Sequence, residues 1–302
     1  MLRRGIMKKK IPIILLFIIG IAIFFYPAVS NLITSRNSSK VINEYDDKVS
    51  RMSKKDREKE KERAKAYNDS LTNLVIKDPF SQDASATNEG DSYANYLNIG
   101  EAMAYIVIPK ISVKLPIYHG FSERVLQKGI GHVPNTSLPI PGKETHSVLT
   151  GHSGLPEAKL FTDLNKLHMG DEFYIQVIDE INTYSIDKID VLEPENIKAF
   201  EILPGENYVT LITCTPYAVN SHRLLIRGTL VNTSTRDKGE IIQEEDVSIV
   251  EEGKEEINET FNLDKYKIII SLFIIALILV AISSIIWSKR QRKKRLHKHD
   301  DK

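Results

Sequence analysis

Apolar residues are distributed along this chain in two different patterns. Near each end lies an unbroken apolar run, IPIILLFIIGIAIFFYPAV at 11–29 and IIISLFIIALILVAISSIIW at 268–287. Between residues 98 and 232 the apolar residues instead form short groups separated by Pro, Gly, Asn or Asp. The first pattern is typical of helices that cross about 30 Å of hydrocarbon, and the second of β-strands joined by turns.

Eight short runs in the central region predict the strands of one all-β barrel or sandwich. They are rich in the β-branched and aromatic residues that pleated sheets favour. The runs are MAYIVI (103–108), SVKLPIY (112–118), HSVLTGH (146–152), EFYIQV (172–177), INTYSI (181–186), KIDVLE (188–193), NYVTLITC (207–214) and RLLIRGTL (223–230). Two short helices are expected among them, at 122–128 and 159–167. A core spanning 98–232 has the size of one ordinary domain.

The segments that connect this domain to the apolar runs are polar. Residues 47–65, DKVSRMSKKDREKEKERAK, alternate both signs of charge with almost no apolar face, so we expect a solvent-exposed helical stalk within 30–97. Residues 77–98 are rich in Ser, Asn, Asp and Gly and predict a loop. Residues 233–267 are acidic and are interpreted as a linker to the second apolar run.

Charge orients the two apolar runs. Residues 1–10 carry +5 and residues 288–302 carry +6 of a formal total of +1, so the remainder carries −10. Positive flanks mark the cytoplasmic side of a membrane helix, which places both termini inside and 30–267 outside. The first run is expected to be a retained anchor, and a cleaved signal peptide is the alternative. The acidic outer portion excludes nucleic-acid binding driven by phosphate neutralisation.

Cys214, the only cysteine, ends a strand-like run in TLITCTPYAVNSHRLLIRG (210–228). A buried, inert thiol is one interpretation of a lone cysteine. Its position favours chemistry, because it lies at a strand end and Thr215-Pro216 stops the strand. If 207–214 and 223–230 are antiparallel neighbours, Cys214 and Arg223 are cross-strand partners with Cβ atoms roughly 5 Å apart. The guanidinium would then favour the thiolate or hold an oxyanion.

A nucleophilic cysteine requires a base, and several histidines are candidates. His152 lies in LTGHSGLP, just past a predicted strand, but spacing alone does not choose among it and His119, His132 and His146. His297 and His299 fall in the basic tail. The sequence has no zinc-protease motif, paired cysteines or EF-hand loop, so neither a metal nor another cofactor is expected.

At this point the chain resembles the sortases, the cysteine transpeptidases of Gram-positive surfaces, and within them class C, the pilin polymerases. The resemblance covers about residues 98–230 and rests on these motifs: IPKISVKLPIYHG (108–120), GIGHVPNTSLPIPG (129–142), TGHSGLP (150–156), KLFTDLNKLHMGDEF (159–173) and TCTPYAVNSHRLLIRG (213–228). It implies an eight-stranded sortase-type β-barrel. It also implies that His152 is the acid/base, Cys214 the nucleophile and Arg223 the residue that positions substrate or holds the oxyanion.

The resemblance further implies a lid, formed by an Asp-Pro-aromatic tripeptide over the active site. Asp78, Pro79 and Phe80 stand where that lid would lie; Asp78 would pair with Arg223 and Phe80 would cap the Cys214 sulfur. Taken alone, Asp-Pro is an ordinary turn signal. A membrane segment at each end also suits class C. Ala218-Val219 and Ser221 depart from the residues common in that loop.

By this resemblance the substrate is an LPxTG-bearing protein, cleaved between Thr and Gly and transferred to an amine, such as a pilin lysine. Anchoring of surface proteins to a cell-wall precursor is one alternative, and a surface cysteine protease that hydrolyses the same thioester is another. A catalytically silent adhesion module is the non-enzymatic alternative. The expected location is the membrane of a Gram-positive bacterium, with the catalytic domain outside and no nucleic-acid partner.

Overall fold

The computed structural model describes residues 2–71, 78–80, 93–156, 158–194, 200 and 202–235, with side chains from residue 16 onward. All of them belong to one compact unit, Met1–Val250. The second apolar run at 268–287 and the basic tail at 288–302 lie outside the described residues. The predictions of a second membrane helix and of cytoplasmic ends therefore stay predictions.

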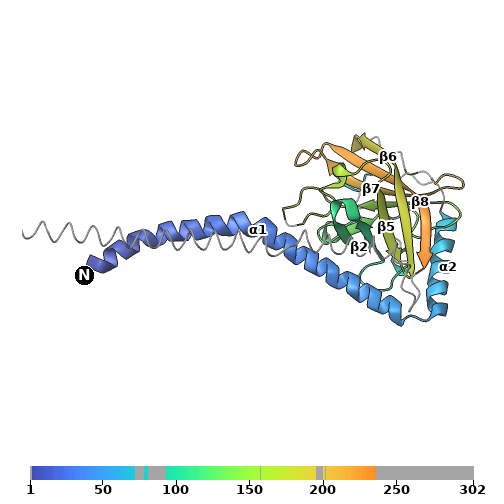
Figure 1. Ribbon diagram of the computed structural model, residues 1–302, viewed down its shortest axis with the longest axis horizontal. Helices are drawn as coiled ribbons and strands as arrows, with labels where there is room; N and C mark the ends of the chain where they lie inside the picture. The colour runs from blue at the N-terminus through green and yellow to red at the C-terminus, as the bar shows by residue number, and fades with distance from the viewer. Residues whose placement is uncertain are drawn as a thin grey trace, which may run out of the picture. The chain divides into compact units, whose positions relative to one another are not determined.

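A closed eight-stranded barrel forms the centre of the chain (Figure 1). The strands follow one another around the barrel in the order β1-β2-β3-β4-β7-β8-β6-β5. Their bounds are β1 Ala104–Ile108, β2 Val113–His119, β3 Ile130–His132, β4 Thr145–Thr150, β5 Glu172–Val177, β6 Glu180–Leu192, β7 Asn207–Thr215 and β8 His222–Thr235. Two pairs, β2–β3 and β4–β7, are parallel, and the others are antiparallel. The predicted barrel of eight strands is thus confirmed.

The number of strands was predicted correctly, but two predicted strands are in fact one, and one observed strand was not predicted. The runs at 181–186 and 188–193 are one strand, β6, whose pairing with β8 shifts register between Ile186 and Lys188. Asp187, which separated the runs in the sequence, is the extra residue of this β-bulge. β3 was missed because it is three residues long and its centre is Gly131. That glycine is required there, since a Cβ would lie 2.4 Å from the carbonyl oxygen of Gly120.

The short helices agree only partly with expectation. The segment at 122–128 contains α3, Glu123–Leu126, with Ser122 at its N-terminal cap position. The segment at 159–167 is mostly turns and contains only the 3-10 helix η4, Leu164–Lys166. Two further 3-10 turns, η2 at Tyr93–Asn95 and η3 at Pro109–Ile111, precede and follow β1.

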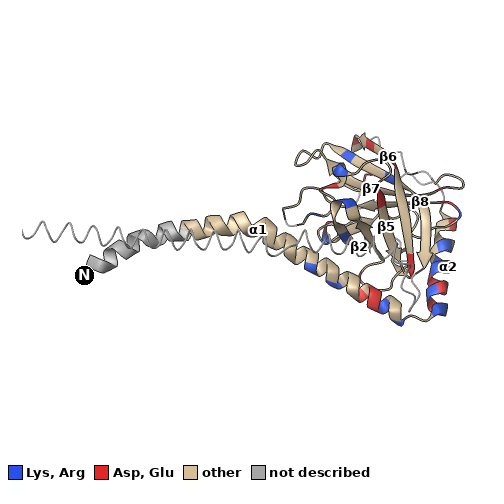
Figure 2. Ribbon diagram, in the orientation of Figure 1, with Lys and Arg blue, Asp and Glu red and all other residues tan. Residues whose placement is uncertain are grey.

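α1, Leu2–Arg51, is the one helix in the described part of the chain that is long and apolar enough to cross a membrane. Between Leu16 and Ile33 most of its large apolar side chains are exposed, and Figure 2 shows this stretch without charged residues. Further along the same helix, Ile42, Tyr45 and Val49 are buried. The Tyr45 hydroxyl accepts a hydrogen bond of 2.7 Å from the backbone N–H of Ile178, at the turn between β5 and β6. The end of α1 is therefore fixed to the barrel.

α2, Lys54–Ser70, begins after a break in which the Ser53 side chain accepts a hydrogen bond from the N–H of Asp56. The expectation of a fully solvated stalk over 47–65 is wrong for this helix, because Lys61, Ala64 and Asn68 are buried. Lys61 Nζ lies 3.2 Å from both Asp179 and Glu180, and Arg57 lies 3.1 Å from Asp179. The mixed charges visible along α2 in Figure 2 thus include its contacts with the β5–β6 turn. The sequence of α2 has no apolar face, and these ion pairs hold the helix against the barrel instead.

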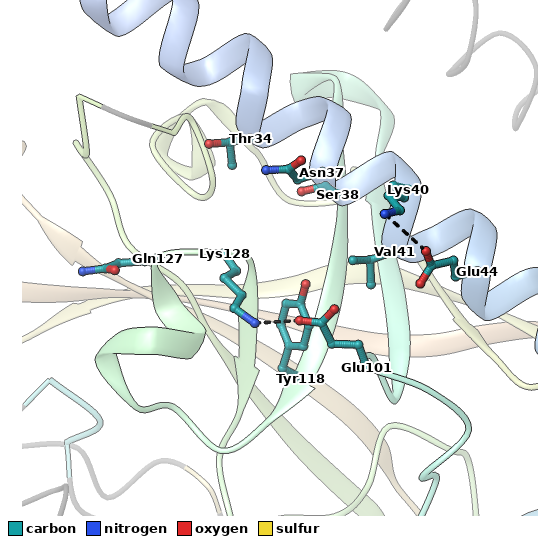
Figure 3. Close-up of a pocket in the computed structure, with 10 residues that line it drawn as sticks. All are labelled: Thr34, Asn37, Ser38, Lys40, Val41, Glu44, Glu101, Tyr118, Gln127 and Lys128. Carbon is teal, nitrogen blue, oxygen red and sulfur yellow. Dashed lines mark hydrogen bonds and ion pairs between the residues drawn. The ribbon is translucent and has the colours of Figure 1, made fainter.

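A cavity of about 360 Å³ lies between α1 and the barrel (Figure 3). Its lining is mixed, with hydroxyl, amide, ammonium and carboxylate groups around the Tyr118 ring. The lining residues are Thr34, Asn37, Ser38, Lys40, Val41, Glu44, Glu101, Tyr118, Gln127 and Lys128. Lys128 pairs with Glu101 at 2.6 Å across this space. The cavity lies next to α3, which begins at Glu123, because Gln127 and Lys128 directly follow the end of this helix.

Candidate active site

Cys214 and Arg223 are direct cross-strand partners. β7 and β8 are antiparallel, and their register pairs Cys214 with Arg223 and Thr215 with His222. The juxtaposition expected from spacing is confirmed. Cys214 is half-buried, whereas Arg223 is only 6% exposed. A thiol and a guanidinium therefore share one end of the barrel, next to the loop that joins the two strands.

His152 is brought to the same end by the neighbouring strand. β4 runs parallel to β7, with Thr150 opposite Ile212. Past the end of β4 the contact continues, because Gly151 N–H donates to the Ile212 carbonyl at 3.1 Å and Thr213 Oγ1 donates to the Gly151 carbonyl at 2.7 Å. His152 follows directly, beside the strand end that carries Cys214.

Close packing explains the glycine that precedes His152. A Cβ at Gly151 would lie 2.7 Å from Cδ1 of Ile130 and 2.9 Å from Cδ2 of Phe161. The backbone of His152 is fixed on the other side, since its carbonyl accepts a hydrogen bond from the N–H of Phe161 at 3.1 Å. The glycine of the TGH sequence therefore allows the close packing that positions His152.

The other histidines that spacing had left open are engaged elsewhere. Nε2 of His146 lies 2.8 Å from the Thr210 hydroxyl, and Nε2 of His119 lies 2.7 Å from the Tyr96 carbonyl. His132 is fully buried and lies 2.5 Å from the Tyr93 hydroxyl; its burial lowers its pKa to about 4. These rings hold the fold together, and His152 is the candidate that remains beside Cys214.

Asp78 pairs with Arg223. Its carboxylate accepts two hydrogen bonds from the guanidinium, at 2.9 Å from Nε and 2.8 Å from Nη2. Both side chains are almost fully buried, at 7% and 6% exposed. Nη1 of Arg223 donates to the carbonyls of Asn220 and His222. The pairing that the lid hypothesis required is present, and it occupies the edge of the guanidinium formed by Nε and Nη2.

Phe80 lies close to both Arg223 and His152. The Arg223 guanidinium carbon is 5.2 Å from the centre of the Phe80 ring, and the His152 ring centre is 5.8 Å from it. Phe80 also packs against a small apolar cluster separate from the main core, composed of Val133, Val148, Phe200, Ile212 and Leu225. Asp78 and Phe80 thus contact two of the three candidate catalytic residues.

The thiol of Cys214 experiences three opposing influences. Burial raises its pKa, the positive charge of Arg223 lowers it, and the negative charge of Asp78 raises it. Burial is the largest of the three, so the pKa of the thiol lies above its ordinary value. With Asp78 in place, the site favours the neutral thiol over the reactive thiolate.

Two neighbours of the site were not found from the sequence. Glu123, the first residue of α3, has Oε2 3.3 Å from Nε2 of His152. Tyr217 is 63% exposed on the β7–β8 loop and lies so close to Gly154 that a Cβ there would be 2.8 Å from its ring. No sequence signal links residues about 30 and 60 positions apart, because each contact depends on how loops close around the barrel.

Comparison with known proteins gives a consistent result. The Sortase domain family matches residues 106–231. Sortase C-1 of Actinomyces oris is 45% identical, with 59% of this chain and 99% of that one covered and a TM-score of 0.57. The pilus-related Sortase C of Group B Streptococcus is 44% identical, with 63% and 96% covered and a TM-score of 0.59.

A more distant relative, Sortase SrtE1 of Streptomyces coelicolor, is 30% identical over 51% of this chain and 49% of its own length. The chain thus spans about half the length of that curated relative. It spans nearly all of the two similar sortase C structures. The chain belongs to the sortase family of cysteine transpeptidases, and its similarity to the sortase C structures places it in class C.

Proposed function

We propose that this sortase cleaves an LPxTG-like signal between Thr and Gly and joins the new carboxyl end to a lysine of a pilin subunit. In this scheme Cys214 is the nucleophile, His152 the acid/base and Arg223 the oxyanion partner. The observation that carries the proposal is the register of β7 and β8, which places Cys214 directly opposite Arg223 at the strand ends.

The first half-reaction forms a thioester. The Cys214 thiolate adds to the Thr carbonyl carbon, and the carbonyl oxygen becomes an oxyanion facing the Arg223 guanidinium. The C–N bond to Gly then breaks, and protonated His152 gives its proton to the departing amine. The peptide beyond Thr leaves with a free amino group.

The second half-reaction regenerates the thiol. A lysine amine adds to the thioester carbonyl, His152 accepts the proton that the amine loses, and the C–S bond breaks to leave the Cys214 thiolate. One amide is exchanged for another through a covalent intermediate. No ATP is consumed, which suits an enzyme that works outside the cell.

Two contacts of residues 78–80 support a role for this segment as a lid. Asp78 occupies the Nε and Nη2 donors of Arg223, and Phe80 covers the apolar cluster formed by Val133, Val148, Phe200, Ile212 and Leu225. We propose that residues 78–80 move away before the signal binds. The apolar cluster would then receive the Leu of the signal in place of the Phe80 ring.

The pilin acceptor and the membrane location rest on similarity and composition. The Group B Streptococcus relative, 44% identical, is pilus-related. The exposed apolar stretch of α1 supports a membrane anchor, and sortases act on the Gram-positive surface. The basic flanks at 1–10 and 288–302 support a topology with both termini inside.

The test uses the full chain in detergent micelles, incubated with an LPxTG peptide and analysed by intact mass. We expect a thioester adduct on Cys214 that is absent in Cys214→Ala and strongly reduced in His152→Ala and Arg223→Ala. Asp78→Ala is tested in parallel, because a closed site would suppress the adduct in the native chain. No adduct in either the native chain or Asp78→Ala would refute the proposal.

A second step separates the alternatives. A pilin fragment that carries an acceptor lysine is added to the preformed thioester. Formation of the amide supports polymerisation; transfer only to a cell-wall precursor amine would indicate anchoring. Hydrolysis that the acceptors do not change would indicate a protease.

A further inference from the structure

Glu123 occupies a position from which it can act on His152. It is the first residue of α3, and its Oε2 atom lies 3.3 Å from Nε2 of His152. The two residues belong to different segments of the chain, since α3 follows β2 whereas His152 follows β4. The proximity therefore results from the closure of the barrel and not from a shared element.

The other oxygen of Glu123 is already held. Nε2 of Gln127 donates to Oε1 of Glu123 at 3.0 Å, one helical turn further along. Gln127 also lines the cavity beside α1 (Figure 3). The carboxylate thus has one oxygen fixed by an amide and the other directed at the imidazole, which defines the rotamer that faces the active site.

The ring nitrogen that faces Glu123 needs this partner. Nε2 of His152 is buried, and the 3.3 Å contact is an ion-pair distance without the alignment of a hydrogen bond, so among the described residues Nε2 makes no hydrogen bond. A buried polar nitrogen without a partner is unfavourable. A small rotation of the Glu123 carboxylate, with Oε1 still bonded to Gln127, would supply an acceptor. Nδ1 is then the nitrogen left for the thiol and the departing amine.

We propose that Glu123 is a positioning residue for His152: it holds Nε2–H and keeps Nδ1 towards the reacting atoms. A third group that orients the base in this way is a recurring feature of nucleophilic catalysis. This role rests on the proposed function of His152. Because exposed ion pairs contribute little to stability, the effect belongs to activity and not to folding.

The test compares Glu123→Gln, Glu123→Asp and Glu101→Gln in the full chain in micelles, each with Asp78→Ala so that the lid does not limit the rate. Glu101 is the matched control, because it is also an exposed glutamate whose carboxylate contacts a side-chain nitrogen near α3, that of Lys128. Initial rates of peptide transfer give kcat and KM over a range of pH. The rate of Cys214 alkylation by iodoacetamide is measured over the same range.

We expect Glu123→Gln to lower kcat about three- to tenfold with KM unchanged, in keeping with a single partly screened charge contact. The pH profile of Cys214 alkylation should also change, because a ring that Glu123 no longer orients presents a different nitrogen position to the thiol. Glu123→Asp should recover part of both effects, and Glu101→Gln should match the parent. Equal profiles for Glu123→Gln and Glu101→Gln would overturn the proposal, as would a loss of kcat accompanied by a lower melting temperature and an unmoved pH profile.

Failure of the proposed function gives a different pattern. If no variant forms a thioester, peptide transfer is absent throughout, yet the alkylation profile still reports whether Glu123 alters the environment of the thiol and imidazole. An alkylation profile that moves in Glu123→Gln and not in Glu101→Gln supports the positioning role by itself. A profile that moves in neither variant overturns it.

Discussion

At the scale of single residues, the pKa of the Cys214 thiol depends first on burial, which raises it, and then on two charges of opposite sign. Arg223 lies opposite the thiol and lowers its pKa, while Asp78, which pairs with the same guanidinium, raises it. Burial adds to the effect of Asp78. Asp78 therefore affects the thiol electrostatically through its charge, in addition to pairing with Arg223.

Replacing Asp78 by Asn tests this directly. The change removes one contribution that raises the Cys214 pKa, so the pKa should fall. At any pH below the pKa the thiolate fraction then rises, about tenfold for each unit of pKa. We expect iodoacetamide alkylation at pH 7 to become about three- to tenfold faster, with the pH profile displaced to lower pH.

The matched control is Asp187→Asn. Asp187 also makes a two-pronged pair with an arginine of β8, Arg227, at 3.1 and 2.6 Å. It lies at the bulge of β6, away from the register pair of Cys214. Its removal should leave alkylation unchanged. If Asp78→Asn and Asp187→Asn behave alike, the lid carboxylate does not control the thiol.

At the scale of elements, α2 is held to the barrel by charge. Lys61 is 6% exposed and contacts three carboxylates, those of Glu58, Asp179 and Glu180. Asp179 is itself almost fully buried. A buried charge group of this kind is costly to break from one side, because the remaining charges stay in a poorly hydrated environment.

We predict that Lys61→Met lowers the free energy of unfolding by about 2 kcal/mol, even though methionine retains most of the apolar stem. Thermal unfolding of the full chain, followed by circular dichroism, measures the loss. Lys65→Met, one turn further on the exposed side of α2, is the control and should change stability by less than about 0.5 kcal/mol. Similar melting temperatures for the two variants would show that the buried ion pairs do not fix α2.

At the scale of the whole molecule, buried histidines tie the segment before β1 to the barrel. His132 lies between the Tyr93 hydroxyl at 2.5 Å and the Ser137 carbonyl at 2.8 Å. The His119 ring contacts the Tyr93 ring edge-on, and burial lowers the pKa of this histidine too. Both rings are therefore kept neutral by the fold, which makes stability depend on pH.

The sign of that dependence follows from the proton balance. In the unfolded chain His132 takes up a proton near its ordinary pKa of 6.5, but in the folded protein only near 4. Between these values the unfolded state binds more protons, so stability falls as pH falls. We predict a loss of at most about 3 kcal/mol from His132 between pH 6.5 and 4, measured by urea unfolding at a series of pH values.

Two variants separate His132 from the other histidines. His132→Gln should flatten the pH dependence, since an amide does not titrate in this range. His168→Gln, at an exposed position, should leave it unchanged. A native chain whose stability is constant from pH 6.5 to 4 would contradict the prediction, as would a slope that His132→Gln leaves intact.

Patterns local in sequence were predictable because they depend on short-range chemistry. The apolar run of α1, most of the strands and the opposition of Cys214 to Arg223 follow from periodicity and from a hairpin whose strands are close in sequence. The sequence also showed an interruption of the apolar pattern at Asp187, but not that this interruption is a bulge within the single strand β6. The lid tripeptide was located by resemblance, and the structure shows its pairing with Arg223.

Tertiary structure alone decided contacts between residues far apart in sequence. β3 owes its existence to pairing with β2 and β4, not to its own composition. α2 looked fully solvated because its burial depends on carboxylates more than 100 residues away. The choice of His152 among the histidines, and the approach of Glu123 to it, follow from the parallel β4–β7 pairing and the loops it places together. The sequence determined the reactive groups; closure of the barrel determined which of them meet, because long-range contacts depend on geometry that no local pattern encodes.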